Sequence, residues 1–412
     1  MKLLLSAYDC DPVRGSEARL SWNYVKEFAA LGHEIHVLTS TRSAEHLPAG
    51  LAELTARGAN VDATMIGDHR LARRIPRLGW MGRYLLWQWH ALDAARDIDA
   101  AFDADIVHHV GWGSLQGGSR LWQLGKPFLF GPVGGAQHAP AAFKEYFGSS
   151  WRREWLRTTI SVRSTRFLPT IRGPFQHAEA ILAANRETYD LARRIGAKRI
   201  ELIRDVAIPP DLIVDSVQRR PDDKSLRIVW LARHMPRKGL ALALDAFAKV
   251  APDCPVQLTV VGADGTAPEL VERSERIRSA SDDANRLVFR GVLDWPAAQA
   301  TLRDADVFLF TSLRDTTGVQ LLEAIASGLA VITLDHHGGG EIVSDDIGIT
   351  VPVIDPETTS SGIADAIERL ANDRELTFQL RENARAKAPS FSWPKHAAFI
   401  DALYQDILSQ QP

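Results

Sequence analysis

Cysteine is scarce in this chain, whose 412 residues include only two, Cys10 and Cys254. The two lie in different halves of the sequence, so nothing indicates a disulfide framework, and no cysteine spacing typical of a metal site is present. This composition suits a reducing compartment. We therefore expect a cytoplasmic protein.

Long hydrophobic runs are also missing. The apolar opening Met1–Ala7 ends at Asp9, before it reaches the length of a signal peptide. No other stretch approaches the roughly 20 apolar residues that a membrane-spanning helix needs. Internal repeats and low-complexity segments are absent as well. The sequence predicts a protein that is soluble or peripheral at the inner face of a membrane.

An excess of one charge is absent overall, since the formal net charge is -3 and charged residues make up 24% of the chain. The two halves nevertheless differ, with a balance of +6 over residues 1–210 and -9 over residues 211–412. The first half is therefore the better partner for an anionic surface. A hydrophobic content of 45% over this length is ample for two domains with their own cores.

The patterning predicts an α/β protein. Short apolar runs alternate with helical periodicity in both halves, which favours mostly parallel sheets. A Pro-containing linker around Pro209 and Pro210 separates the halves. We expect an N-terminal Rossmann-like domain over 1–208, a second over 209–391, and a C-terminal helix over 392–412 that packs back toward the first. Ligands of open α/β sheets bind at the carboxyl ends of the strands.

Two segments of the second half carry chemistry. The first follows an expected strand and contains Arg233 and Lys238 just before a glycine, which suits a diphosphate site. In the second, Asp315 and Glu323 flank a helix start, and a glycine run follows one strand later. Helix starts offer unpaired N–H groups to anions. Taken alone, each segment also fits an ordinary solvated loop.

These segments resemble the retaining glycosyltransferases of family 4. The likeness rests on R-x4-K-G from Arg233 and on TSLRDTTGVQLLEAIASGLAVITLDHHGGGE at 311–341. It extends to SAYDCDPVRGSEARLSW near the N-terminus, FGPVGGA at 130–136 and the closing FSW. It is closest to members of bacterial exopolysaccharide and O-antigen assembly. The resemblance implies a GT-B fold, in which two Rossmann-like domains face each other across a cleft.

The resemblance also implies roles for single residues. Arg233 and Lys238 would bind the diphosphate of the donor, and Glu323 would bind the ribose. Asp315 would contact the transferred sugar from a position where the family usually has glutamate. The glycine run Gly338, Gly339 and Gly340, followed by Glu341, would present N–H groups near the phosphate or sugar.

In the first half, the resemblance places Gly15 against the phosphate, although Ala18-Arg19-Leu20-Ser21 departs from the usual PGxG, and a purely structural turn remains open. His108 and His109 match the family's strand-end histidine. Only one of two neighbouring strand residues can face a site, and the alternative is a histidine satisfied within the core. Gln137 and His138 are further candidate contacts to sugar or acceptor.

Short D-x-D matches, which a metal-dependent transferase would use, occur four times, and we interpret them as chance matches. We therefore expect no metal and no other cofactor.

Two stretches, Arg70–His90 and Trp151–Arg172, interleave basic and aromatic residues, and the second has six arginines against Glu154. Such a surface suits anionic lipid headgroups. The alternative is a solvated helix face with its tryptophans in the core. No nucleic-acid motif accompanies either stretch.

The sequence thus predicts a retaining glycosyltransferase that moves a sugar from a UDP- or GDP-sugar to a saccharide acceptor, lipid-linked in our interpretation, in bacterial polysaccharide assembly. One alternative is an epimerase or hydrolase of nucleotide sugars on the same fold. Another is a catalytically silent module that binds a glycan or a partner enzyme.

Overall fold

A computed structural model describes residues 1–15, 17–68, 79–165, 167–219, 221, 225–281, 283 and 285–410. The chain divides into two compact units, each made of several segments. Unit 1 comprises Met1–Ala136, Arg157–Val206 and Trp393–Pro412, and unit 2 comprises Gln137–Leu156 and Ala207–Ser392. The sequence assigned residues 137–156 to the first domain, whereas in the structure this stretch packs with unit 2. We call it the inserted segment.

Unit 1 is built on a seven-stranded parallel sheet with the strand order β3-β2-β1-β4-β5-β6-β7. Its strands are β1 Lys2–Ala7, β2 Glu34–Ser40, β3 Val61–Ile66, β4 Ile106–His109, β5 Phe128–Val133, β6 Ala180–Ala183 and β7 Ile200–Leu202. Its helices are α1 Glu17–Ala30, η1 Thr41–Ser43, α2 Leu47–Ala56, α4 Trp80–Phe102, η2 Leu121–Leu124, α6 Pro169–His177, α7 Arg186–Ile195 and α15 Trp393–Ser409. Central strands such as β1 and β5 are buried along almost their whole length, as parallel strands covered on both faces should be.

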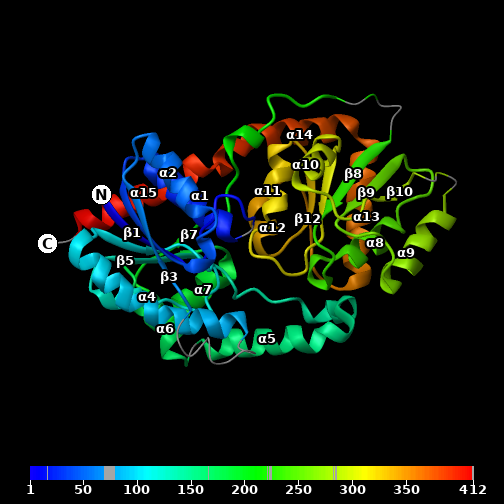
Figure 1. Ribbon diagram of the computed structural model, residues 1–412. Coiled ribbons are helices and arrows are strands. Elements are labelled where there is room, and N and C mark those ends of the chain that lie inside the picture. The colour runs from blue at the N-terminus through cyan, green and yellow to red at the C-terminus, as the bar shows by residue number, and fades with distance from the viewer. Residues whose placement is uncertain are drawn as a thin grey trace. The chain divides into compact units, whose positions relative to one another are not determined.

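Helix α15 belongs to the core of unit 1 although it comes last in the sequence. In Figure 1 its red ribbon lies beside the blue helix α1, and the two are in contact. The Tyr24 hydroxyl on α1 lies 2.8 Å from Nε2 of His396, and His108 Nδ1 on β4 hydrogen-bonds the Tyr404 hydroxyl. A buried polar network therefore joins the first and last parts of the sequence.

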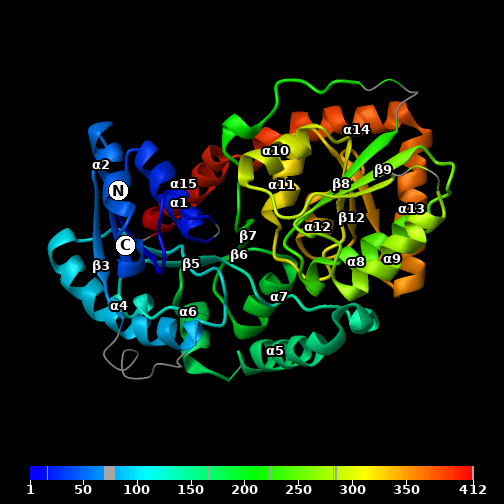
Figure 2. The same cartoon turned by 45° about the vertical axis from the view of Figure 1, so that its right-hand side comes forward.

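Unit 2 contains a six-stranded parallel sheet with the order β10-β9-β8-β11-β12-β13. Its strands are β8 Leu226–Leu231, β9 Val256–Val261, β10 Leu287–Phe289, β11 Val307–Phe310, β12 Ala330–Leu334 and β13 Gly348–Val351. Its helices are η3 Ala141–Ser150, η4 Pro210–Leu212, η5 Pro236–Lys238, α8 Leu240–Phe247, α9 Pro268–Ser279, α10 Trp295–Arg303, α11 Val319–Ala326, α12 His337–Ile342, α13 Pro356–Asn372, α14 Arg374–Lys387 and η6 Ala388–Phe391. Figure 2 shows α13 and α8 next to each other at this sheet, where they pack together.

The inserted segment contributes to the core of unit 2. Phe143 and Phe147 of η3 are 0% and 4% exposed and belong to the same hydrophobic cluster as Trp230 and Phe247. The segment continues into helix α5, Trp151–Ser164, whose first residues belong to unit 2 and whose remainder belongs to unit 1. Burial of two aromatic side chains, each worth on the order of 2 kcal/mol, anchors the segment.

Candidate functional site

The predicted donor residues of unit 2 gather where its strand order reverses. From β8 the chain builds outward through β9 and β10, and it then returns to place β11 on the other side of β8. Because all of these strands are parallel, their carboxyl ends share one edge of the sheet. Lys238 follows β8 and Asp315 follows β11, so the two flank the reversal point, where open α/β sheets bind ligands.

Lys238 and Asp315 form a buried ion pair in this place. The Lys238 ammonium contacts Oδ2 of Asp315, and their side chains are 7% and 17% exposed. Asp315 also accepts hydrogen bonds from Ser312 Oγ at 3.3 Å and from the Thr316 amide at 3.2 Å. The turn after Lys238 needs glycine, because Gly239 has a φ of +71° and a Cβ there would lie 2.0 Å from the Thr311 carbonyl oxygen.

Burial and the opposite charges act against each other on both members of this pair. Burial lowers the pKa of Lys238, although the charge of Asp315 opposes that shift. For Asp315, burial would raise the pKa, but the attraction of Lys238 and Arg237 outweighs it and leaves the pKa below its ordinary value. Arg237 Nη1 lies 3.5 Å from Asp315 Oδ1. Arg233 is exposed and makes no side-chain ion pair within the described part of the chain. Two cations therefore contact one carboxylate, and Arg233 adds a third positive charge to the same loop, which leaves a positive excess for an anionic ligand.

Glu323 lies on α11 and meets an aromatic partner that the sequence did not reveal. Trp295 Nε1, at the start of α10, donates a hydrogen bond of 3.3 Å to Oε1 of Glu323. Burial raises the pKa of Glu323, against the opposing effect of hydrogen bonds from Trp295 and Gln299. A partly desolvated carboxylate of this kind is a suitable acceptor for two neighbouring hydroxyl groups.

The glycine run after β12 has a packing reason of its own. A Cβ on Gly338 would lie 2.3 Å from the Thr316 carbonyl oxygen, and one on Gly339 would lie 2.5 Å from Thr333 Oγ1. Helix α12 can therefore press against the loop after β11 only because these residues lack side chains. Gly340 donates its amide to the His336 carbonyl at 3.1 Å, and Glu341 is exposed. That Gly338 and Gly339 offer N–H groups to a ligand stays a prediction.

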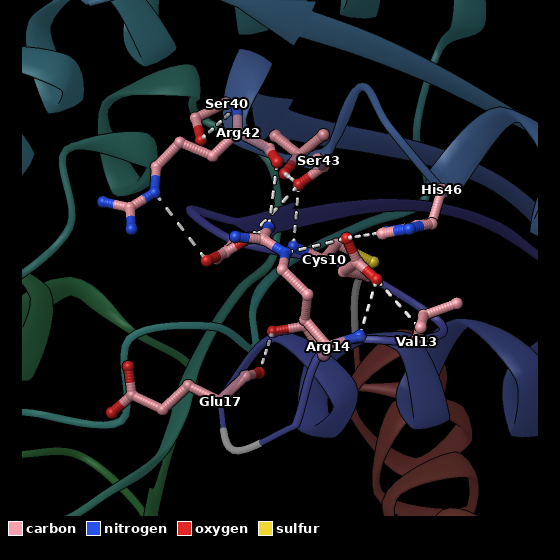
Figure 3. Close-up of polar contacts among 12 residues, drawn as sticks. Cys10, Val13, Arg14, Glu17, Ser40, Arg42, Ser43 and His46 are labelled. Carbon is pink, nitrogen blue, oxygen red and sulfur yellow. Dashed lines mark hydrogen bonds and ion pairs between the residues drawn. The ribbon is translucent and has the colours of Figure 1, made fainter.

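The loop after β1 in unit 1 is fixed by one buried carboxylate. Asp11, fully buried, accepts hydrogen bonds at 2.8 Å from the amides of Val13 and Arg14, and another from the Arg14 side chain, while His46 Nδ1 lies 3.0 Å away. Burial would raise the pKa of Asp11, but these donors lower it well below its ordinary value. Figure 3 shows the Arg14 side chain reaching into the centre of this cluster.

Gly15 lies in this same loop and is not required by the atoms around it. A Cβ at Gly15 would meet nothing within 4 Å, and its φ lies outside the positive range that favours glycine. The protein's own packing therefore gives no reason for glycine here. The close approach of a ligand to the backbone remains the reason that the sequence predicts.

The two histidines of β4 are buried and hydrogen-bonded within unit 1. His108 is 0% exposed, and its ring nitrogens reach the Tyr404 hydroxyl and, at 2.7 Å, the Gly131 carbonyl. His109 is 1% exposed, with Ser6 Oγ at 3.2 Å and the Tyr84 hydroxyl at 3.1 Å. Burial lowers the pKa of His108 to about 4 and that of His109 to about 3. Both rings are enclosed in the core of unit 1 and are already hydrogen-bonded, and contact of one of them with the sugar stays a prediction.

Gln137 and His138 open the inserted segment, and they contact Thr316 and His337 of unit 2. Gln137 Nε2 donates a hydrogen bond of 2.9 Å to Thr316 Oγ1, next to Asp315. The His138 carbonyl lies 3.1 Å from His337 Nε2. Sequence reasoning assigned no role to Arg237, Trp295 or the pair Glu154–Arg314. For Arg237 alone there was a local signal, since it precedes Lys238 in the basic motif.

Several carboxylates of the D-x-D matches are paired with basic side chains. Asp9 and Asp11 pair with Arg14, Asp103 with Lys126, and Asp306 with Arg381. Within the described residues, no group of three or more histidine, cysteine or acidic side chains is arranged to hold a metal ion.

The basic and aromatic stretches are described in part. Of Arg70–His90, residues 70–78 lie outside the described residues, and the rest begins α4 with Trp80 and Trp89 exposed. In the other stretch, Trp155, Leu156 and Ile160 are exposed on α5. A search of the described helices finds none with the length and hydropathy needed to cross a membrane.

Comparisons with known proteins agree with this architecture. Residues 18–204 match the model of Glycosyltransferase Family 4, and residues 225–373 match that of Glycosyl transferases group 1. A phosphatidyl-myo-inositol mannosyltransferase of Mycobacterium tuberculosis is 27% identical over 61% of this chain and 65% of its own length. The chain thus spans about two thirds of that relative. An alpha-D-kanosaminyltransferase of Streptomyces kanamyceticus is 24% identical over 72% of this chain and 83% of its own length.

Solved structures show the same fold at low sequence identity. Sucrose-phosphate synthase from Thermosynechococcus elongatus superposes with a TM-score of 0.64 at 18% identity, covering 100% of both chains. Anabaena HepE in complex with UDP gives a TM-score of 0.60 at 16% identity, covering 98% of this chain and 100% of that one. With both halves matched by family models and the two α/β units in place, the chain belongs to glycosyltransferase family 4 and has the GT-B fold.

Proposed function

We propose that the protein transfers a sugar from a nucleoside-diphosphate donor, a UDP- or GDP-sugar, to a saccharide acceptor with retention of anomeric configuration. The observation that carries this proposal is the contact of Arg237 and Lys238 with Asp315 at the reversal point of the unit 2 sheet, in the basic loop that also contains Arg233. A diphosphate is the ligand that matches several cations clustered beside strand ends.

Each chemical group of the donor, namely the diphosphate, the ribose and the transferred sugar, has residues of unit 2 to bind it. Arg233 and Lys238 neutralise the diphosphate, whose charge grows as it leaves, and such stabilisation is usually the largest catalytic contribution. The Glu323 carboxylate accepts hydrogen bonds from the ribose hydroxyls. Asp315 orients the Lys238 ammonium and contacts the transferred sugar with the rest of its carboxylate.

Retention follows from attack on the face from which the nucleotide leaves. The departing phosphate then accepts the proton of the attacking hydroxyl, so the protein need not supply a dedicated base. This assignment agrees with the structure of β4, whose two histidines are engaged within the core. Because cationic side chains supply the charge, we expect no metal requirement, and transfer should be unchanged in excess chelator.

For the acceptor, we propose a lipid-linked saccharide of bacterial polysaccharide assembly. Relatives are named for transfer to phosphatidyl-myo-inositol, and one solved neighbour is named for lipopolysaccharide biosynthesis. The exposed Trp155, Leu156 and Ile160 of α5, beside Arg152 and Arg153, suit a peripheral contact with anionic lipid at the cytoplasmic face. Binding to vesicles with anionic lipid, but not to neutral vesicles, is the expected result.

Substitution of Lys238 tests the proposal most directly. Lys238→Ala is expected to lower the rate of sugar transfer by about two orders of magnitude or more, the scale of losing one preorganised charge partner. Lys249→Ala is the matched control, because it removes a lysine of unit 2 that pairs with Glu357 away from this site. Transfer within a few-fold of wild type in Lys238→Ala would refute the diphosphate assignment.

Thermal unfolding with UDP-, GDP- and dTDP-sugars identifies the donor class, because a bound donor raises the melting temperature by mass action. Turnover of the donor without any acceptor would instead favour an epimerase or hydrolase. The absence of nucleoside diphosphate binding in both wild type and Glu323→Ala would favour a silent binding module.

A further inference from the structure

We propose that the inserted segment, residues 137–156, is a structural part of the donor site, with Gln137 and Glu154 as positioning residues for the loop that carries Asp315. The inference deepens the proposed function and rests on it for its catalytic consequence. The positioning itself is a property of the free protein and can be tested without a donor.

The segment is firmly anchored in unit 2. Phe143 is fully buried and Phe147 nearly so, in the hydrophobic cluster that also contains residues of β8 and α8. Helix η3 packs against η5, the short helix that ends at Lys238. The segment is therefore held in a fixed position relative to the basic loop after β8. Other residues that the segment contacts are held relative to that loop as well.

Two side chains of the segment contact residues on either side of Asp315. Gln137, 4% exposed, donates its amide to Thr316 Oγ1 at 2.9 Å. Glu154 Oε1 lies 2.6 Å from Arg314 Nε, and the two side chains are 10% and 16% exposed. Since Arg314 and Thr316 are the neighbours of Asp315 in sequence, the backbone on both sides of that carboxylate is tied to the segment.

Other contacts complete the support of the same loop. Arg237 Nη1 donates to the Arg314 carbonyl at 3.1 Å, and the Leu313 amide donates to the Arg237 carbonyl at 2.8 Å. Helix α12 abuts the loop from another direction, through the close approach of Gly338 to Thr316. Of these supports, only Gln137 and Glu154 come from outside the contiguous stretch 207–392 of unit 2.

The energetics favour a positioning role for these contacts. A largely buried ion pair contributes little net stability but is costly to break, because the remaining partner keeps its charge without compensation. Removing the Glu154 charge would therefore displace Arg314 and the backbone that follows it. A shift of about 1 Å in a catalytic group can cost about a hundredfold in rate. Loss of either contact should change catalysis through Asp315 and Lys238, without direct contact to the donor.

Hydrogen exchange on the ligand-free protein is the first test. In Gln137→Ala and Glu154→Gln, we expect the amides of residues 312–318 to exchange about tenfold faster or more, the result of weaker local stability. Amides of β12 and α13 should keep their wild-type rates. Glu145→Gln is the matched control, because Glu145 is an exposed carboxylate of the same segment. Unchanged exchange at 312–318 in both variants overturns the inference, whether or not the wild type transfers sugar.

Kinetics with a double-mutant cycle is the second test. Glu154→Gln and Arg314→Gln should each lower kcat/KM for the donor about tenfold or more, and the double variant should lose little beyond either single change because the two act as a pair. Faster exchange with kcat/KM at the wild-type level would overturn the positioning role. A wild type that neither binds nucleoside diphosphate nor transfers sugar would defeat the proposed function alone, since the exchange result does not depend on it.

Discussion

At the scale of single residues, Glu323 shows how a partly buried carboxylate can lower stability. Its pKa in the folded protein is raised because burial disfavours the charged carboxylate. Above the ordinary glutamate pKa of about 4.3, the unfolded chain ionises freely, whereas the folded chain ionises with difficulty. The carboxylate therefore makes folding less favourable at neutral pH than at pH 4.

Glu323→Gln tests this cost. The variant should have a higher free energy of unfolding than the wild type at pH 7 to 8, and the difference should shrink as pH falls below about 4.3, where both side chains are neutral. Urea unfolding at several pH values measures it. The same variant should bind nucleoside diphosphate more weakly. A variant less stable than wild type at pH 8 would contradict the assigned environment.

Single residues also differ in how far the sequence predicts them. Lys238, Asp315 and Glu323 lie within motifs whose spacing is local, so their approach to one edge of the sheet follows from parallel strands alone. Trp295 and Glu154 lie in other elements, and their contacts with Glu323 and Arg314 depend on tertiary packing. The burial of both His108 and His109 was not predicted, for a related reason. Alternation along a strand does not reveal that helices cover both faces of β4.

At the scale of elements, α12 and the loop after β11 form a close backbone contact. Gly338→Ala should destabilise unit 2, because the added Cβ would approach the Thr316 carbonyl oxygen to 2.3 Å and one element must move. Overpacking of this kind costs about 1–3 kcal/mol. Thermal unfolding, followed together with sugar transfer, measures the effect.

Gly15→Ala is the control for that change, since a Cβ at Gly15 meets nothing within 4 Å. The Gly15→Ala variant should keep the wild-type melting temperature and yet bind the donor more weakly. This result is expected if glycine is needed there to let a ligand come close to the backbone. An equal fall in melting temperature in Gly15→Ala and Gly338→Ala would contradict the different reasons given for the two glycines.

Elements were predicted well where their periodicity is local. The strands and the helix opened by Trp393-Pro394 follow from apolar runs and start signals that lie within each segment. The placement of 137–156 could not be predicted in this way. Phe143 and Phe147 look like ordinary apolar residues of a short helix, and nothing in their neighbourhood says which of two cores buries them.

At the scale of the whole molecule, unit 1 carries a cluster of buried neutral histidines. Burial lowers the pKa of His108 to about 4, and it lowers the pKa values of His109 and His396 to about 3. In the unfolded chain, histidine titrates near 6.5. Between these values the unfolded chain binds more protons than the folded one, so stability falls as pH decreases from about 6.5 toward 4.

Acid should therefore unfold unit 1 cooperatively with proton uptake. The expected measurement is a urea midpoint, followed by hydrogen exchange in β1 and β4, that drops steeply below pH 6.5. His396→Gln retains a hydrogen-bond partner for the Tyr24 hydroxyl and should reduce this slope, because one of the three sites no longer titrates. A slope equal to that of the wild type would contradict the assigned environment of His396.

The place of α15 in unit 1 has a consequence for biosynthesis. Many proteins complete their N-terminal domain on the ribosome while the rest is still being translated. Here Tyr404 and His396 fill the interior of unit 1 from residues 393–412, after all of unit 2 has been synthesised. The nascent first half must wait, with part of its core open, for about 190 further residues to emerge at about 5–20 residues per second. Unit 2 can therefore complete its folding before unit 1. This reverses the usual order, in which the N-terminal domain folds first during synthesis.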